Sequence, residues 1–238
     1  GDPEVRVSGV SLNSNTVEEN ELFAALPGRT AHGIVFVSQA ITRGASAILT
    51  DSAGVKWLEQ SDLHIELPVV MVSDPRASLG SVCKLVYADP AGGMILLGIT
   101  GTNGKSTTSS MIYQAARAVG IRAGLIGTLA TVMDGEEVGS VRTTPEAPDL
   151  FRTIARMKNG GVKLIVMEVS SIALSEHRVN AVEFDCVGFT NLSHDHLDYH
   201  DSMVEYFSAK SQLFSQRFAR SALICTDSSW GMKLSKSI

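Results

Sequence analysis

The sequence has few cysteines, and it has no long hydrophobic run. Cys83, Cys186 and Cys225 are an odd number of cysteines, far apart in a chain of 238 residues. This spacing disfavours a disulfide framework, and the apolar neighbours of all three predict reduced, buried thiols in a cytoplasmic protein. The longest apolar run is far shorter than the roughly 20 residues of a membrane span, so we expect no membrane partner.

The chain also lacks a basic cluster and a secretory leader. Lysine and arginine number 20 against 25 acidic residues, which gives a net charge of −5. Binding to a nucleic-acid backbone depends on clustered positive charge, so this balance argues against nucleic acid as the main partner. The first residues, Gly1 to Glu4, resemble no signal peptide and lack an initiator Met, so we expect a processed or excised N-terminus.

The sequence does contain an alternation of apolar strands and helical segments, which predicts an α/β fold with a mostly parallel sheet. In the first part we expect strands at 22–26, 47–49 and 69–72. We expect one helix at 34–43 and another that follows the strand at 69–72 and ends at about residue 87. A linker rich in Pro and Gly follows at 89–93. In the second part we expect strands at 94–99, 125–126, 164–167, 186–189 and 222–225.

Three further helices carry recognisable signals. After the strand at 94–99, a stripe of apolar positions that includes Met111 and Val119 predicts the buried face of one helix. Pro145 is expected in the first turn of the second helix, with Leu150 on its inner face. Ser202 and Glu205 form a capping box that begins the third helix, which is expected to extend to about residue 217.

A glycine-rich loop follows the strand at 94–99 and leads into a helix, which is the arrangement that cradles nucleotide phosphates. Backbone N–H groups and the helix N-terminus provide partial positive charge, Lys105 provides a full charge, and Ser106 can hold Mg²⁺. The loop departs from the standard P-loop at one place, because Ile99 stands where a glycine is usual and the glycine is Gly98.

Polar side chains follow two more strands of the predicted sheet. Glu168 comes directly after the apolar strand at 164–167, and Thr190 and Asn191 follow the strand at 186–189. Ligands of doubly wound sheets bind at the carboxyl ends of strands. Glu168 is therefore a candidate ligand of Mg²⁺, directly or through water, although a capping or solvated carboxylate would give the same pattern.

Two other features leave several interpretations open. Residues 194–200 contain three histidines, which suits a Zn²⁺ site, an acid/base centre or a polar loop. Lys210 completes an apolar helix face that contains Met203, Phe207 and Phe214. A lysine there either extends its amine to solvent, pairs with a carboxylate or loses its proton, and a neutral amine can react with CO₂ to give a carbamate.

Taken together, these motifs resemble the Mur ligase family, and within it the branch that adds a diamino acid. The loop T-G-T-N-G-K-S at 100–106 is that family's variant of the P-loop, which accounts for Ile99. The stretch at 22–28 resembles the family's UDP-binding domain. The other segments that follow the family pattern are 143–146, 167–171, 191–200 and 206–214.

The resemblance implies an ATP-dependent ligase of peptidoglycan precursor synthesis. It implies a UDP-binding domain over 1–91, an incomplete ATP-binding domain over 92–238, and the absence of a C-terminal ligase domain. ATP would phosphorylate the terminal D-Glu of UDP-MurNAc-L-Ala-D-Glu, and a diamino acid would attack the acyl phosphate. The resemblance favours meso-diaminopimelate as this diamino acid, with L-lysine as the alternative. We expect a cytoplasmic monomer, and we expect that this chain alone does not complete ligation.

The resemblance also implies site residues. The ATP contacts are Gly101, Thr102, Asn103, Gly104, Lys105, Ser106 and Thr107. The contacts of the UDP-muramoyl-dipeptide are Ser14 (at the uracil), Thr143, Thr144, Ser170 and Arg178. Two Mg²⁺ sites would use Ser106 in one and Glu168, His196 and N6-carboxylysine at Lys210 in the other. The catalytic residues would be Lys105 and Lys210.

Three positions depart from the family pattern: Ile172 replaces a His, Glu176 replaces a Gln, and Asn15 replaces an Arg beside Ser14. Two other functions fit part of the sequence. One is a related ligase such as folylpolyglutamate synthase, which the N-terminal domain and the segment 143–145 disfavour. The other is a non-catalytic module that binds a nucleotide or a UDP-sugar.

Overall fold

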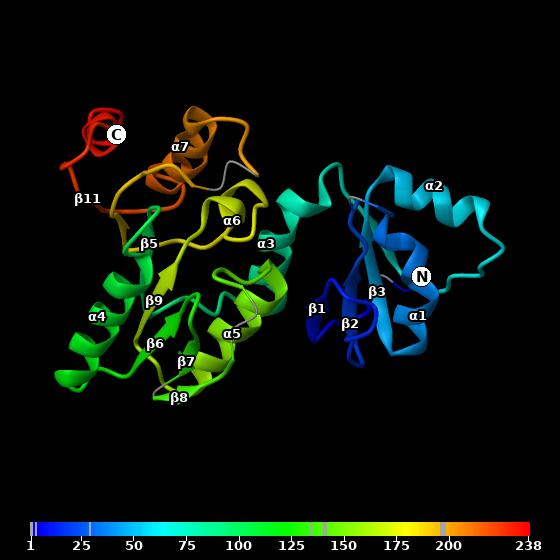
Figure 1. Ribbon diagram of the computed structural model, residues 1–238. Coiled ribbons are helices and arrows are strands. Elements are labelled where there is room, and N and C mark those ends of the chain that lie inside the picture. Colours follow the sequence, from blue (N-terminus) through cyan, green and yellow to red (C-terminus); the bar gives the residue numbers. More distant parts are fainter. Residues whose placement is uncertain (1, 3, 29, 134, 140–141, 196–198) are drawn as a thin grey trace. The chain divides into compact units, whose positions relative to one another are not determined.

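The computed structural model describes the whole chain except residues 1, 3, 29, 134, 140–141 and 196–198. The chain divides into two compact units (Figure 1). Unit 1 comprises Gly1–Asp89 with Ala147–Arg152, and unit 2 comprises Pro90–Glu146 with Thr153–Ile238. Both units are mixed α/β structures, as the alternating pattern of the sequence predicts.

Unit 1 is built on a parallel sheet with the strand order β1-β2-β3-β4. Its core contains Phe23, Ile34, Val37 and Ile48. The strands are β1 (Gly9–Ser11), β2 (Glu21–Ala24), β3 (Ala45–Thr50) and β4 (Val69–Met71). The helices are η1 (Gly33–Phe36), α1 (Val37–Thr42), α2 (Ser52–Gln60) and α3 (Pro75–Val86).

Two helices of unit 1 begin at aspartate caps. The side chain of Asp51 accepts a hydrogen bond from the backbone N–H of Gly54 at 2.8 Å, and Asp74 accepts one from Ala77 at 2.9 Å. These bonds satisfy backbone donors that a helix N-terminus leaves without an intrahelical partner. The helix α2 is absent from the elements that we expected, although Asp51 is a typical start signal.

Unit 2 is built on a larger sheet with the strand order β11-β10-β5-β9-β6-β7-β8. The strands from β11 to β6 pair in parallel, and β7 and β8 add antiparallel pairings at one edge. The strands are β5 (Ile95–Thr100), β6 (Ala123–Ile126), β7 (Thr131–Met133), β8 (Glu136–Glu137), β9 (Leu164–Glu168), β10 (Cys186–Phe189) and β11 (Ala222–Ile224).

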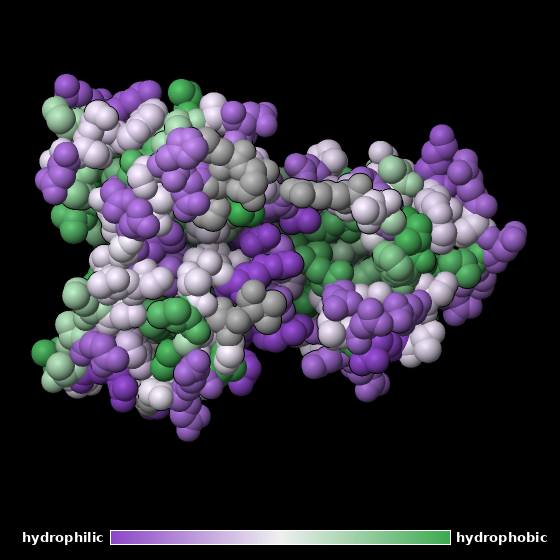
Figure 2. All heavy atoms as spheres, in the orientation of Figure 1, coloured by the Kyte–Doolittle hydropathy of each residue, from purple (hydrophilic) through white to green (hydrophobic). Residues whose placement is uncertain are grey.

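The remaining helices are α4 (Lys105–Ala118), α5 (Ala147–Asn159), α6 (Ser171–Ser175), α7 (Met203–Ser211), η2 (Gln212–Phe214) and α8 (Ser229–Ser235). Every residue of β9 is buried, as the unbroken apolar run predicts for a central parallel strand. Figure 2 shows hydrophobic residues scattered in small groups among polar ones on the visible surface of unit 2. Within the part of the chain that the structure describes, no helix combines the length and the apolar character needed to cross a membrane.

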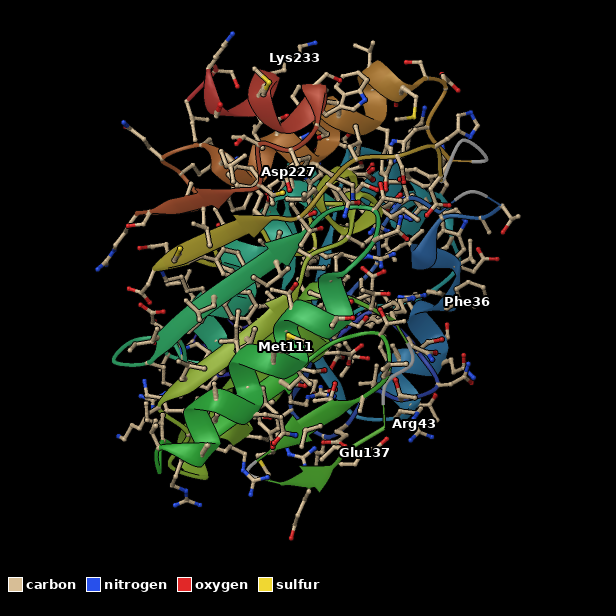
Figure 3. All side chains as sticks on the ribbon, turned by 60° about the vertical axis from the view of Figure 1, so that its left-hand side comes forward. Phe36, Arg43, Met111, Glu137, Asp227 and Lys233 are labelled. Carbon is tan, nitrogen blue, oxygen red and sulfur yellow. The ribbon has the colours of Figure 1, made fainter. Side chains whose placement is uncertain are left out.

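The prediction for the buried face of α4 is only partly right. Met111, which is labelled in Figure 3, is exposed, and so is Val119. Of the predicted stripe, Ala116 is buried and Ile112 is partly buried. Tyr113, which was not predicted, is buried with them in a cluster with Ile99 and Val166 of the sheet. This helix carries apolar residues on more than one side, so the choice of buried face depends on how the helix packs against the strands.

Three smaller predictions also need correction. The helix α5 begins at Ala147, so Pro145 precedes it and Pro148 occupies the first turn. The helix α7 ends at Ser211 and continues only as the short η2. All three cysteines are free, but Cys83 alone is fully buried, Cys186 is partly buried and Cys225 is exposed.

The order of the strands brings three polar segments together. β5 lies between β9 and β10, with Ile99 paired to Glu168 and Thr100 paired to Phe189. Because these strands are parallel and in register, the residues that follow them meet at one edge of the sheet. That edge is where ligands bind in doubly wound folds.

Shortening Leu96, the second residue of the central strand β5, should strongly destabilise unit 2. Leu96 is 2% exposed, whereas Leu223 in the edge strand β11 is 74% exposed. We expect Leu96→Ala to lower the free energy of unfolding by about 2–5 kcal/mol, because it leaves a cavity. The matched variant Leu223→Ala should change it by less than about 0.5 kcal/mol. Chemical denaturation measures both, and equal losses would contradict this assignment of the core.

Candidate functional site

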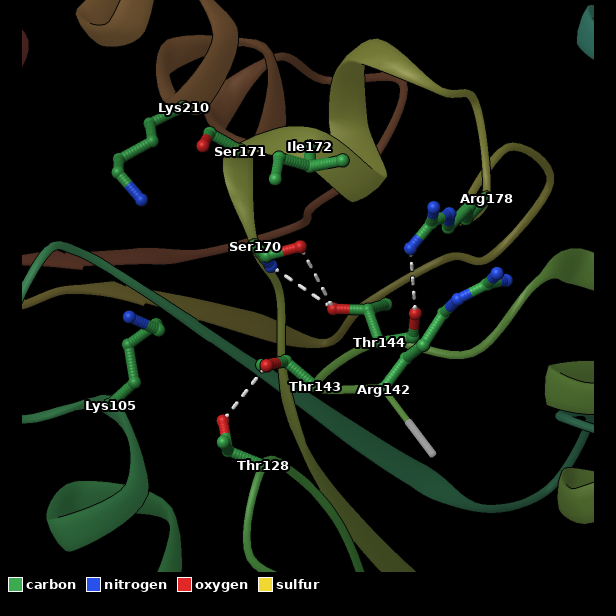
Figure 4. Close-up of a pocket in the computed structure, with 10 residues that line it drawn as sticks. All are labelled: Lys105, Thr128, Arg142, Thr143, Thr144, Ser170, Ser171, Ile172, Arg178 and Lys210. Carbon is green, nitrogen blue, oxygen red and sulfur yellow. Dashed lines mark hydrogen bonds between the residues drawn. The ribbon is translucent and has the colours of Figure 1, made fainter. Parts of the chain in front are cut away.

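Unit 2 contains a cavity of about 580 Å³ at the carboxyl ends of the central strands. Figure 4 shows lysine side chains at one end and arginine side chains at the other, with hydroxyl groups between them. The lining residues are Lys105, Thr128, Arg142, Thr143, Thr144, Ser170, Ser171, Ile172, Arg178 and Lys210. Four of these side chains are cationic and none is acidic, so the lining suits an anionic ligand.

The glycine-rich loop is held in place by the end of β10. Thr190 Oγ1 and Asn191 Nδ2 donate to the carbonyl of Asn103 at 2.7 and 2.9 Å, and the Thr102 N–H donates to the Asn191 carbonyl at 3.0 Å. Gly101 has a φ of +149°, and a Cβ there would lie 3.0 Å from the Asn191 carbonyl oxygen. The loop conformation therefore needs a glycine at this position.

Two lysines converge on the carbonyl oxygen of Gly101. Lys105 Nζ donates to it at 3.0 Å and to the Thr102 carbonyl at 2.9 Å, and Lys210 Nζ donates to the same Gly101 oxygen at 2.9 Å. Burial lowers the pKa of Lys105, while the negative charges of Glu168 and Asp195 oppose this shift. The loop thus gathers two cations at one end of the cavity.

Lys210 is the more deeply buried of the two, with 1% of its surface exposed. Its Nζ lies 4.6 Å from the centre of the Tyr206 ring, and the Tyr206 hydroxyl lies 3.1 Å from Thr102 Oγ1. Burial, together with the nearby charge of Lys105, lowers the pKa of Lys210 to about 7, while the negative charge of Asp195 opposes the shift. Of the sequence alternatives, extension of the amine to solvent is therefore wrong.

Glu168 is the last residue of β9 and is 2% exposed. Its Oε2 accepts hydrogen bonds from Ser106 Oγ at 2.9 Å and from Thr128 Oγ1 at 3.0 Å. Its Oε1 accepts a bond from the Thr128 N–H at 3.0 Å. The structure thus places the predicted metal ligands Ser106 and Glu168 in direct contact.

The segment Thr143-Thr144 is joined to Glu168 and to the start of α6. Thr143 Oγ1 lies 3.0 Å from Thr128 Oγ1, and Thr144 Oγ1 donates to the Glu168 carbonyl at 2.9 Å. Thr144 Oγ1 also accepts a bond from the N–H of Ser170 at 3.1 Å. Ser170 is the N-cap of α6, where its Oγ accepts from the Ala173 N–H at 3.1 Å.

At the other end of the cavity, Glu146 binds two arginines. Its Oε1 lies 2.7 Å from Arg142 Nη1 and 3.0 Å from Arg178 Nε. Arg178 Nη1 also donates to the Thr144 carbonyl at 3.3 Å. The planar guanidinium groups suit carboxylate ligands, whereas the lysine end presents compact charges that suit phosphate oxygens.

Of the predicted site residues that the structure describes, Lys105, Thr143, Thr144, Ser170, Arg178 and Lys210 line this cavity, and the others do not. Ser14 belongs to unit 1, where its Oγ donates to Gln39 Oε1 at 2.7 Å. His196 lies outside the described residues. Within the described residues, no group of three or more His, Cys, Asp or Glu side chains could hold a metal ion.

Two of the residues that depart from the family pattern, Ile172 and Glu176, lie at or near the site. Ile172 lines the cavity, and Glu176 accepts a hydrogen bond from the Tyr199 hydroxyl at 2.8 Å.

His200 is buried, with its Nε2 2.9 Å from Ser171 Oγ and its ring stacked on Tyr206 at 5.1 Å. His200 therefore has a packing role in this structure.

Thr128, Arg142 and Tyr206 belong to the site but were not predicted as site residues. Arg142 directly precedes the Thr143-Thr144 pair, so its place in the sequence could have pointed to it. Thr128 follows a short strand and has no motif around it that we recognised. Its role depends on a contact with Glu168, which is 40 residues away in the chain.

Comparisons with known proteins show which family the chain resembles. A family model described as the Mur ligase middle domain matches residues 99–238, and one described as the Mur ligase family, catalytic domain, matches residues 6–86. A Corynebacterium glutamicum protein named UDP-N-acetylmuramoyl-L-alanyl-D-glutamate--2,6-diaminopimelate ligase is 43% identical over 235 residues. That match covers 97% of this chain and 45% of the relative.

Two further proteins are similar over the same share of this chain. A UDP-N-acetylmuramyl-tripeptide synthetase of Leifsonia xyli is 42% identical over 97% of this chain and 44% of its own length. A solved structure of a UDP-N-acetylmuramoyl-L-alanyl-D-glutamate--2,6-diaminopimelate ligase superposes with a TM-score of 0.77 at 26% identity, over 97% of this chain and 45% of its own. The chain thus spans a little under half the length of these relatives.

The depressed pKa of Lys210 predicts a pH-dependent stability. From about pH 7 to 10.5 the unfolded chain holds a proton on this amine that the folded chain does not, so stability rises with pH. Lys210→Met removes this effect. We expect Lys210→Met to have a higher free energy of unfolding than wild type at about pH 6. This difference should become smaller as the pH rises to about 9, by at most roughly 1.4 kcal/mol per pH unit.

Chemical denaturation in CO₂-free buffers at a series of pH values measures this difference. The comparison uses wild type and Lys210→Met under the same conditions, so groups common to both chains cancel. A difference that stays constant over this range would contradict the lowered pKa.

Proposed function

The chain belongs to the Mur ligase family, and from this premise we propose that it forms the UDP-binding and ATP-binding parts of an amide ligase. The ligase would join a diamino acid to UDP-MurNAc-L-Ala-D-Glu in peptidoglycan precursor synthesis. The observation that carries the proposal is the joining of the phosphate loop, Glu168 and the Thr143-Thr144 segment around one cationic cavity. The names of the Corynebacterium glutamicum relative and of the similar solved structure support diaminopimelate as the diamino acid.

The proposal assigns a role to each part of the chain. Residues 1–91 would bind the uridine diphosphate end, with Ser14 at the uracil. Residues 92–238 would bind ATP and the peptide end of the acceptor. The family models that match 6–86 and 99–238 support this division. We propose that the protein acts in the cytoplasm, where ATP is available, and as a monomer.

The lysine end of the cavity would take the phosphates of ATP. Backbone N–H groups at the start of α4 and the charge of Lys105 would compensate phosphate charge, with Gly101, Thr102, Asn103, Gly104 and Thr107 forming the surrounding loop. The ammonium of Lys105 already lies on the loop carbonyls, so it needs only a small side-chain movement to reach a bound phosphate.

Ser106 and Glu168 fit a magnesium ion, because both offer oxygen atoms and those atoms lie 2.9 Å apart. Magnesium would neutralise charge on the transferred phosphoryl group. Ser106 donates its proton to Glu168, so the lone pairs of its oxygen remain for a cation. The proposed second site requires an oxygen ligand at Lys210, which its amine does not provide.

A carbamate on Lys210 would supply that ligand, together with Glu168 and His196. A pKa of about 7 leaves much of the amine neutral at neutral pH, and the neutral amine is the form that adds to CO₂. The addition to the neutral amine forms one N–C bond, breaks one C=O π bond of CO₂ and releases one proton. With the proton that the ammonium loses beforehand, it converts a buried cation into an anion beside Lys105, which relieves the repulsion between the two lysines.

The reaction would proceed in two steps. The carboxylate of the terminal D-Glu attacks the γ-phosphorus of ATP, which forms an acyl phosphate and releases ADP. The amine of the diamino acid then attacks the acyl carbon, which forms the amide and releases inorganic phosphate and a proton. Lys105 would stabilise the phosphoryl group during transfer, while Thr143, Thr144, Ser170 and Arg178 would orient the acceptor.

Binding of ATP tests the proposal. We expect the chain to bind ATP in the presence of Mg²⁺, and Lys105→Ala to weaken binding by about tenfold or more, because a charge-assisted bond to phosphate is lost. The matched control Lys163→Ala changes an exposed lysine and should leave the affinity unchanged. Isothermal titration calorimetry measures all three proteins.

Two outcomes would contradict the proposal in different ways. A wild-type chain without affinity for ATP would favour a module that binds only a UDP-sugar. Equal affinities of wild type and Lys105→Ala would contradict the role of the lysine.

The carbamate has its own test. In buffer saturated with ¹³C-labelled bicarbonate, we expect the wild-type chain to show a carbamate carbon resonance that disappears in Lys210→Met. Lys163→Ala is again the matched control and should keep the resonance. A wild-type spectrum without this resonance would count against the modification.

A further inference from the structure

Thr128 connects the two halves of the cavity that the proposed function assigns to different reactants. It lies directly after β6, in the loop that leads to β7. One of its neighbours is Glu168, which we have placed at the metal, and the other is Thr143, which we have placed at the acceptor. The side chain of Thr128 also lines the cavity itself.

Thr128 holds both oxygens of the Glu168 carboxylate. Its N–H donates to Oε1 at 3.0 Å and its hydroxyl donates to Oε2 at 3.0 Å. The preceding residue must be a glycine for this approach, because a Cβ at Gly127 would collide with Oε1 and lie 3.1 Å from the carboxyl carbon of Glu168. Two bonds from one residue fix the rotation of a carboxylate as well as its position.

The hydroxyl of Thr128 is the donor in both of its side-chain hydrogen bonds. It donates to Glu168 Oε2 and to Thr143 Oγ1, each at 3.0 Å, so its single proton is shared between these two acceptors. Thr143 therefore accepts from Thr128, and the proton of the Thr143 hydroxyl remains for a ligand in the cavity.

We propose that Thr128 is a positioning residue that orients Glu168 and, by donating to Thr143, leaves the Thr143 hydroxyl to donate to the substrate. A donor at this position takes an oxygen atom, so Thr143 would bind a carbonyl or carboxylate oxygen of the acceptor's peptide part. This inference rests on the proposed function.

Removing the hydroxyl of Thr128 should affect both ligands. Thr128→Val keeps the shape of the side chain, and Thr128 is exposed at the surface of the loop, so the change leaves no cavity. We expect the Mg²⁺ concentration that half-saturates ADP binding to rise about fivefold, and the affinity for UDP-MurNAc-L-Ala-D-Glu to fall about tenfold. Thr128→Ser restores the hydroxyl and should return both values to within about twofold of wild type.

A double-mutant cycle separates positioning from simple packing. Thr143→Val should weaken acceptor binding about fivefold in the wild-type chain but less than about twofold in Thr128→Val, because the hydrogen bond that orients Thr143 is already lost there. Calorimetry of the whole chain supplies the affinities. Thr226→Val, at an exposed threonine of the same unit, is the matched control and should change nothing.

The outcomes are distinguishable. If wild type binds both ligands and Thr128→Val binds them equally well, or if Thr128→Ser is as impaired as Thr128→Val, the role of Thr128 is overturned and the proposed function stands. Additive losses in the cycle overturn the orientation of Thr143. If the wild-type chain binds neither ligand, the proposed function itself fails. Should Thr128→Val not fold, Thr128→Ala, which also lacks the hydroxyl, decides in its place.

Discussion

The hydrogen bonds accepted by the buried carboxylate of Glu168 are the interaction on which the rest of the site depends. A carboxylate that is almost fully removed from water must be compensated by donors, and here they come from Ser106 and Thr128. The carbonyl of the same residue accepts from Thr144. One residue at the end of one strand therefore gathers the phosphate loop, the loop after β6 and the Thr143-Thr144 segment around the cavity.

The cationic groups of the cavity are arranged in two different ways. The arginines share the carboxylate of Glu146, so their charges are partly compensated and their planes are oriented. Lys105 and Lys210 share only a carbonyl oxygen, so they repel each other, and the buried one has a pKa near neutrality. The lysine end is thus the part of the cavity where an added anion, such as a phosphate or a carbamate, lowers the free energy most.

Whether a feature of this structure could be predicted from the sequence depends on how far apart in the chain the interacting residues lie. The parallel strands were predictable, because β9 and β10 are short apolar runs between breaks and need no partner to be recognised. The buried face of α4 was only partly predictable, since Met111 and Val119 are as apolar as the residues that the sheet buries. The capping role of Ser202 was also predictable, because its bond to the Glu205 N–H spans one turn of helix.

The sequence by itself determined the phosphate loop, the family and the polar residues at the strand ends, because these depend on the order of neighbouring residues. Only the tertiary structure explained why the glycine is Gly98: a Cβ there would lie 3.0 Å from the Phe184 ring, while Ile99 packs on the helix side of the sheet. Only the tertiary structure placed Thr128 between Glu168 and Thr143. Such contacts depend on the order in which strands assemble in the sheet, and no local pattern of residues encodes that order.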